Sequence, residues 1–276
     1  MLRLMLAAHN ELSVPPEAGF MCWFKNKYGT VSAGDWQNTP TLTAFTADVV
    51  GSKKFKTWNL QAADVLSSLD LCQPKTYADA CECVYWAFAR KFKPSASRWG
   101  DKNNFHCTQV AVLRAMFRDA QYLHIVRDPR DVACSYREVM RLESRSPYRP
   151  EFPIDCGQIA EEWINNVNSI EREAKELPPA QYRVVRYEDL VNAPEQILRE
   201  ICTWLGLEFD SQMLAFNESN KALALEPSAT MDWKLRTLDP ANPSRVGRHA
   251  YDMNVEQRRA VEAVAGETMK RFGYKA

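Results

Sequence analysis

The sequence predicts an α/β fold in which a parallel sheet is covered by helices on both faces. Residues 122–126 form a mostly apolar run without alternation, typical of a strand buried on both faces, and residues 182–187 predict a second strand. Strands that alternate with helices along a chain pair in parallel. The 276 residues are 46% hydrophobic, which is enough for a sizeable core, and we expect a single domain over 1–276.

The first third of the chain predicts helices and one extended piece. Residues 1–9 have an amphipathic helical pattern, and two prolines end the extended segment 12–17. Residues 18–96 form a helical region rich in large aromatic side chains, most of which we expect in the core. A strand end is expected within 97–102.

The rest of the chain alternates helices with the two strands named above. Helical periodicity and capping residues predict helices over about 106–118, 129–142, 157–176, 194–205 and 254–272.

Composition argues against several classes of protein. The 35 basic residues equal the 35 acidic ones, so the net charge gives no indication of a nucleic-acid partner. The eight cysteines lack zinc-site spacing and predict buried thiols in a reducing compartment. No run reaches the roughly 18 apolar residues of a membrane-spanning helix, and the apolar start is too short for a secretory signal. We expect a cytoplasmic protein that needs no metal.

The junction between strand 122–126 and the following helix is the most informative feature of the sequence. It reads Arg127-Asp-Pro-Arg-Asp131, with Asp128 at the N-cap, Pro129 at the first helical position and Asp131 where a capping box requires an acid. An arginine at a helix N-terminus is well placed to hold a phosphate. The alternative is an ordinary capped helix whose Arg127 forms a salt bridge.

This segment, with Ser135 eight residues after Arg127, resembles the 3′-phosphate site of sulfotransferases. Those enzymes transfer a sulfonate group from 3′-phosphoadenosine 5′-phosphosulfate (PAPS) to an acceptor. The resemblance implies that Arg127 and Ser135 bind the 3′-phosphate of PAPS. It also implies a three-layer α/β/α fold of the P-loop, nucleotide-kinase-like type.

Two further segments resemble donor-binding parts of the same family and follow in the family's order. Arg186-Tyr-Glu-Asp-Leu190 is similar to a strand end whose tyrosine lies near the adenosine, which implies that role for Tyr187. Ser244-Arg-Val-Gly-Arg248 is similar to a late basic loop that folds over the donor. The resemblance implies donor contacts from Ser244, Arg245, Gly247 and Arg248. Taken alone, the two segments are also compatible with a strand followed by an acidic turn and with a short surface loop.

Two segments resemble the acceptor side of the family. Trp99-Gly-Asp-Lys102 implies that Lys102 stabilises developing negative charge, although a surface lysine would look the same locally. Glu17 stands at the spacing of the general base in tyrosylprotein sulfotransferases and bacterial relatives, where an acceptor hydroxyl must lose its proton as it attacks. Glu17 could instead cap a helix that begins near Ala18, and His9 is the second possible base.

The sequence departs from the family's pattern at the start of the chain. The family's Gly-x-Pro-Arg-Ser-Gly-Thr-Thr-type loop, which binds the 5′-phosphosulfate, and the strand before it would precede Leu2. We expect either a fragment of a complete enzyme or a degenerate, non-catalytic relative that binds a nucleotide or a protein partner. A small-molecule kinase would need the same loop and a pair of aspartates for magnesium. We expect the acceptor to bind to the region 18–96. The sequence leaves open whether it is a small molecule, a glycan or a peptide.

Overall fold

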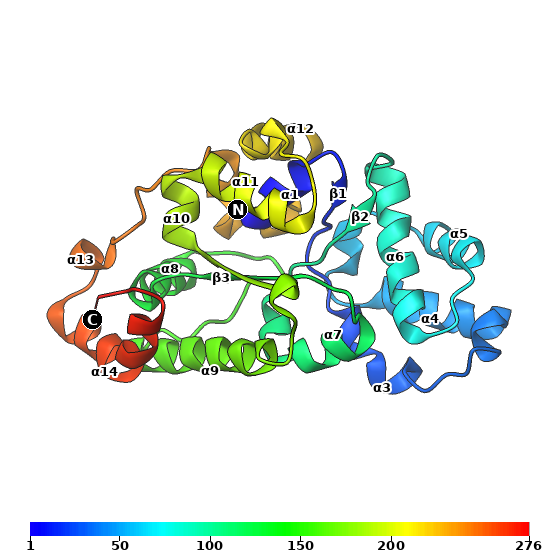
Figure 1. Cartoon of the computed structure of the whole chain (residues 1–276), viewed down its shortest axis with the longest axis horizontal. Coiled ribbons are helices and arrows are strands. Elements are labelled where there is room, and N and C mark those ends of the chain that lie inside the picture. The colour runs from blue at the N-terminus through cyan, green and yellow to red at the C-terminus, as the bar shows by residue number, and fades with distance from the viewer. Residues whose placement is uncertain (276) are drawn as a thin grey trace. The chain divides into compact units, whose positions relative to one another are not determined.

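The computed structural model describes residues 1–275, and helices make up most of them (Figure 1). The chain divides into two compact units, which are described separately below. Unit 1 comprises residues 1–118, 210–229 and 236–238. Unit 2 comprises residues 119–209, 230–235 and 239 onward.

Unit 1 is mainly helical and contains one small parallel sheet. Strand β1 (Leu12–Ser13) pairs in parallel with β2 (Arg98–Trp99). The α-helices of this unit are α1 (Leu2–Ala8), α2 (Phe20–Trp23), α3 (Lys25–Tyr28), α4 (Thr39–Gly51), α5 (Ala62–Cys72), α6 (Tyr77–Phe92), α7 (Val110–Met116) and α12 (Phe216–Leu223). Its 3-10 turns are η1 (Asp35–Gln37), η2 (Phe55–Trp58), η3 (Asn104–Thr108) and η5 (Ser211–Met213).

Aromatic side chains form the core of unit 1, as the sequence predicts. Phe20, Trp58 and Tyr85 are fully buried, and the Phe20 ring lies 5.8 Å from that of Trp58 and 5.7 Å from that of Tyr85. The Tyr85 ring in turn stacks on Trp99 of β2 with 4.3 Å between centroids. This packing fixes the end of β2, which leads directly to Lys102.

Unit 2 contains the longer strands. Strand β3 (Tyr122–Val126) pairs in parallel with β4 (Tyr182–Arg186) along its whole length, from Tyr122 opposite Tyr182 to Val126 opposite Arg186. The helices of this unit are α8 (Pro129–Arg141), α9 (Cys156–Ala174), α10 (Tyr187–Asn192), α11 (Pro194–Leu205), α13 (His249–Asp252) and α14 (Val255–Arg271), with the 3-10 turn η4 (Pro179–Gln181). Two more turns, η6 (Ser228–Trp233) and η7 (Leu235–Leu238), fall where the chain passes between units.

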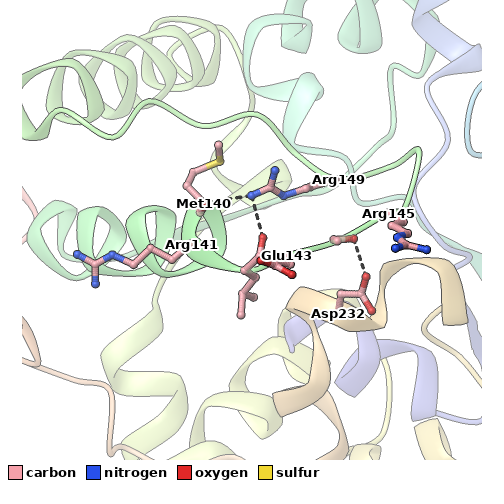
Figure 2. Close-up of a pocket in the computed structure, with 8 residues that line it drawn as sticks. Met140, Arg141, Glu143, Arg145, Arg149 and Asp232 are labelled. Carbon is pink, nitrogen blue, oxygen red and sulfur yellow. Dashed lines mark hydrogen bonds between the residues drawn. The ribbon is translucent and has the colours of Figure 1, made fainter.

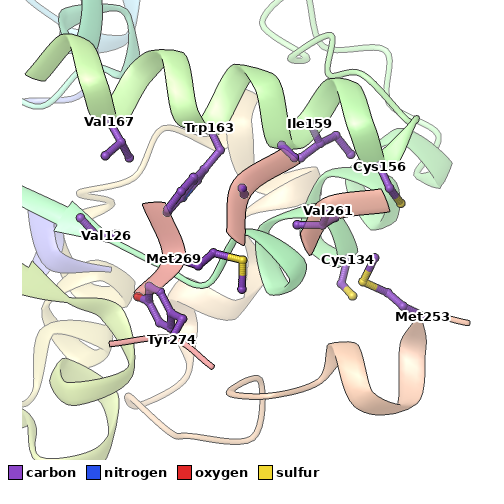
Figure 3. Close-up of a cluster of buried hydrophobic side chains, with 13 residues drawn as sticks. Val126, Cys134, Cys156, Ile159, Trp163, Val167, Met253, Val261, Met269 and Tyr274 are labelled. Carbon is purple, nitrogen blue, oxygen red and sulfur yellow. The ribbon is translucent and has the colours of Figure 1, made fainter. Parts of the chain in front are cut away.

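The core of unit 2 lies where α9 and α14 run side by side (Figure 1). Trp163 of α9, Met269 of α14 and Val126 of β3 belong to one buried cluster, which Figure 3 shows in close-up. The cluster extends onto α8 through Cys134, which is 6% exposed. The phosphate-site helix predicted from the sequence is thus anchored by its apolar face.

The structure confirms the α/β class and the parallel pairing of strands. The described strands form two separate two-stranded sheets. The side chain of Ile125 is 40% exposed, so the expectation that its strand is buried on both faces is wrong. The helix predicted over 106–118 is divided, because the Asn103 side chain accepts a hydrogen bond from Phe105 and caps a 3-10 turn first. None of the helices in residues 1–275 is both long and apolar enough to cross a membrane.

Candidate functional site

Arg127 lies at the carboxyl end of β3 and is fixed through both its backbone and its side chain. Its carbonyl oxygen accepts a hydrogen bond of 3.1 Å from Trp163 Nε1, and its Nη2 donates one of 3.1 Å to the Arg245 carbonyl. The guanidinium carbon lies 4.4 Å from the centre of the Tyr187 ring. Tyr187 is the first residue of α10, so β4 ends at Arg186, one residue before the predicted strand end, and a helix follows it instead of an acidic turn.

The guanidinium of Arg127 has a hydrogen-bond donor that no described residue uses. Its Nε is buried without a hydrogen-bond partner among residues 1–275, and no described carboxylate forms an ion pair with it. The alternative of a simple salt bridge is therefore not what the structure shows. A buried N–H without a partner is destabilising by about 1–3 kcal/mol, unless a ligand supplies the acceptor.

The neighbouring arginine has a structural role instead. Arg130 pairs with Asp128 at 2.7 Å and with Glu262 at 2.8 Å. The Asp128 side chain also accepts from the Arg130 backbone N–H at 2.9 Å, which is the N-cap that the sequence predicts. The charge of Arg130 is thus paired with carboxylates of the protein, whereas that of Arg127 is not paired with any described carboxylate.

Asp131 holds the 244–248 loop rather than capping its own helix. It is fully buried, and its carboxylate accepts hydrogen bonds from the backbone N–H groups of Gly247 (2.8 Å) and His249 (3.0 Å). Burial alone would raise the pKa of Asp131, but the His249 side chain and these N–H groups hold it below its usual range. Gly247 has φ +72°, a left-handed conformation that glycine adopts freely. The capping-box prediction for Asp131 is therefore wrong.

The two arginines of this loop face an acidic side chain. Arg245 and Arg248 both pair with Glu138 of α8, the latter at 2.6 Å, and Arg248 also pairs with Asp252. The hydroxyl of Ser244 hydrogen-bonds Asn242. The structure thus brings the loop onto α8, the helix that carries Ser135, but its cations already have protein partners.

In unit 1 the structure brings together the two predicted acceptor-side residues. Glu17 pairs with Lys102, and a second lysine, Lys54, reaches its other carboxylate oxygen at 2.8 Å. The side chain of Glu17 is 14% exposed and that of Lys102 is 45% exposed. The two ammonium groups stabilise the carboxylate form of Glu17, which is the form that can accept a proton. Sequence analysis missed Lys54, because no motif surrounds it.

The structure does not favour the two alternatives to Glu17 as the base, which are Glu17 as a helix cap and His9 as the base. The helix after Glu17 begins at Phe20 with Gly19 as N-cap and no side-chain cap, so Glu17 does not cap it. His9 is 2% exposed, and its Nδ1 accepts a hydrogen bond of 3.0 Å from the backbone of Glu11. His9 therefore stabilises the turn after α1.

A cavity of about 690 Å³ in unit 2 contains none of the predicted site residues (Figure 2). A hydrogen bond of 2.5 Å from Ser144 to Asp232 holds two of its sides together, and Arg149 donates to the Met140 and Leu142 carbonyls. The cavity is lined by Met140, Arg141, Leu142, Glu143, Ser144, Arg145, Arg149 and Asp232.

Replacing Asp131 by asparagine should release the 244–248 loop. The amide cannot accept all the hydrogen bonds that the carboxylate accepts, so we expect the free energy of unfolding to fall by about 2 kcal/mol. Because the loop also supplies the carbonyl that orients Arg127, nucleotide affinity should fall about tenfold. Urea denaturation and calorimetry measure the two effects. Asp155→Asn, an N-cap replacement that asparagine tolerates, is the control, and equal effects of both variants would contradict this assignment.

Comparisons with known proteins identify the family of the chain. A model of the sulfotransferase family matches residues 1–211. The chain is 26% identical over 178 residues to omega-hydroxy-beta-dihydromenaquinone-9 sulfotransferase Stf3 of Mycobacterium bovis, covering 63% of this chain and 40% of that protein. It is 27% identical over 188 residues to carbohydrate sulfotransferase 1 of Homo sapiens, covering 58% and 44%. The chain therefore spans less than half the length of these curated relatives.

Two solved structures share the fold. A sulfotransferase domain from the curacin biosynthetic pathway superposes with a TM-score of 0.55 at 18% identity, over 99% of this chain and 93% of that one. A sulfotransferase domain from the Synechococcus PCC 7002 olefin synthase gives a TM-score of 0.58 at 18% identity, over 96% and 89%. At this identity the likeness concerns the fold alone. The family match extends over three quarters of the sequence, and the chain belongs to the sulfotransferase family.

Proposed function

We propose that this protein transfers a sulfonate group from PAPS to a hydroxyl or amine of an acceptor. The observation that carries the proposal is the Arg127 guanidinium. It is fixed by Tyr187 and the Arg245 carbonyl, and its buried Nε has no hydrogen-bond partner within residues 1–275. A ribose 3′-phosphate supplies the acceptor oxygens that this group lacks. Family membership supports the reaction class.

We assign the donor contacts as follows. Arg127 and Ser135 bind the 3′-phosphate, and Tyr187 lies beside the adenosine. The Gly247 N–H donates to Asp131, so we assign this glycine to shaping the loop. A direct contact of Ser244, Arg245 or Arg248 with the donor would require each to exchange its present protein partner for a phosphate oxygen.

The transfer itself is an in-line displacement at sulfur. The acceptor oxygen bonds to sulfur while the bond from sulfur to the bridging oxygen breaks, and that electron pair leaves on the 5′-phosphate of 3′-phosphoadenosine 5′-phosphate (PAP). Glu17 takes the acceptor proton. Once Glu17 is neutral, Lys102 is released to balance the charge that develops on the leaving group.

The acceptor class is part of this proposal. The relatives are named for a hydroxylated menaquinone and for carbohydrates, and we propose a small-molecule or glycan hydroxyl here, with peptides as the less supported class. The cytoplasmic location expected from the thiols stays a prediction; none of the eight cysteines, all of which lie within residues 1–275, forms a disulfide.

Calorimetry with PAP tests the donor site. We expect one site per chain, and much weaker binding of adenosine 5′-phosphate, which lacks the 3′-phosphate. Equal affinity for the two nucleotides would refute the assignment of Arg127. Release of PAP from PAPS with a phenol, an alkyl alcohol and N-acetylglucosamine as acceptors then tests transfer, on this chain and on a version extended upstream of Met1. Binding without transfer in both would favour the non-catalytic alternative.

A further inference from the structure

Asp101 and His106 form a buried polar pair in unit 1. Asp101 precedes Lys102 in the chain, and His106 lies in the turn η3. Nδ1 of His106 is 3.2 Å from Oδ2 of Asp101, and their side chains are 14% and 6% exposed. The pair therefore lies directly beside the Lys102–Glu17 ion pair.

The polar atoms of this pair lack completed hydrogen bonds. Both carboxylate oxygens of Asp101, Nε2 of His106 and the hydroxyl of Tyr85 are buried with no hydrogen-bond partner among the described residues. The 3.2 Å approach within the pair lacks hydrogen-bond alignment. Each such group lacks the hydrogen bonds that it would make in water. A cluster of such groups beside a candidate base calls for an explanation, and a role in proton transfer is one that fits its position.

The surroundings of Asp101 make its charge sensitive to pH near neutrality. Burial raises the pKa of Asp101 to about 7; the nearby Tyr85 hydroxyl, Lys102 N–H and Lys102 charge act in the opposite direction, and the Glu17 charge adds to the increase. Burial lowers the pKa of His106 to about 4, so the imidazole is neutral when Asp101 titrates.

Cys22 of α2 and Tyr85 of α6 also face Asp101, and neither is charged at neutral pH. Burial, together with the Asp101 charge, raises the pKa of Cys22 to about 12, and burial raises the pKa of Tyr85 well above its usual value. Among the described residues, the charged groups that act on Asp101 are therefore Glu17 and Lys102.

We propose that Asp101, supported by His106, is a positioning residue that controls the Lys102–Glu17 pair and thereby sets the pH range of sulfonate transfer. As a neutral acid, Asp101 leaves Lys102 on Glu17. As a carboxylate, it competes for the Lys102 ammonium and repels Glu17, so Glu17 binds the acceptor proton more strongly. The inference rests on the proposed function.

Asp101→Asn tests this inference, because asparagine imitates the neutral acid. For transfer to the best acceptor of the panel, we expect the rate of the unmodified protein to rise as the pH passes about 7. The variant should match that rate near pH 5.5, lack the rise, and be about tenfold slower at pH 8.5. Asp48→Asn, which removes a carboxylate paired with Lys27 in the same unit, should keep the original profile.

Unfolding measurements supply a readout that does not depend on transfer. A carboxyl whose folded pKa is raised loses stabilisation as the pH rises from its ordinary value of about 4 to about 7. Asp101→Asn should therefore become progressively more stable than the unmodified protein across that window. A residue that merely supports the fold would instead lose stability on replacement. His106→Leu is the second variant, and it should move the inflection in the rate to higher pH.

The outcomes are distinct. Transfer with the same pH profile in Asp101→Asn and the unmodified protein would overturn the role of Asp101 while leaving the proposed function intact. Absence of transfer by the unmodified chain and by its extended version would overturn both. Loss of the inflection in Asp101→Asn together with the stability difference would support the inference.

Discussion

Arg127→Gln should weaken the binding of PAP by about 100-fold or more. The guanidinium is already oriented by the Tyr187 ring and the Arg245 carbonyl, so its hydrogen bonds to a phosphate require little reordering. A hydrogen bond to a charged group contributes about 1.5–3 kcal/mol, and two of them account for this factor. Glutamine removes the positive charge and most of the N–H donors. Calorimetry measures the effect, and thermal unfolding checks that the variant is folded.

Arg141→Gln is the matched control for this variant, because Arg141 is an exposed arginine at the end of α8, the helix that follows Arg127. Its affinity for PAP should stay close to that of the unmodified protein. If Arg127→Gln binds PAP within threefold of the control, the phosphate contact does not exist and the proposed donor site fails.

Glu17→Gln should slow transfer by about 10²- to 10⁴-fold, the usual contribution of a general base. The amide keeps an oxygen for Lys54 and Lys102 but cannot accept the proton of the acceptor hydroxyl. The affinity for PAP should not change, because the donor contacts assigned above all belong to unit 2. Release of PAP from PAPS gives the rate, and calorimetry gives the affinity.

Glu82→Gln is the control for the base, since its carboxylate oxygen accepts hydrogen bonds from Trp86 and Trp99 and an amide oxygen can do the same. This variant should transfer at the original rate. Undiminished transfer by Glu17→Gln would assign the base to another residue and leave Glu17 as the ion-pair partner of two lysines.

Features that depend on neighbouring residues could be predicted from the sequence. The start of α8 is one example, since Asp128 and Pro129 act within the first turn of the helix. Asp131 illustrates the opposite case. Its spacing fits a capping box, but backbone groups more than a hundred residues later compete for the same carboxylate and are buried with it. A local pattern carries no information about that competition.

On the acceptor side, too, local features could be predicted and features that depend on distant residues could not. The family resemblance singles out Glu17 and Lys102, and the structure pairs their side chains. Lys54, which also pairs with Glu17, has a left-handed backbone conformation with φ +68°. No sequence pattern indicates that conformation for a lysine. Asp101 lies within the Trp99-Gly-Asp-Lys102 motif, but the burial of its side chain beside Tyr85 is a tertiary effect.

Glu138 neutralises both arginines of the 244–248 loop. An incoming phosphate that engages this loop would exchange one internal anion for another instead of displacing mobile ions from bare cations. The contribution of this loop to donor affinity should consequently decline only gently as ionic strength increases, since closely paired charges are screened little by salt.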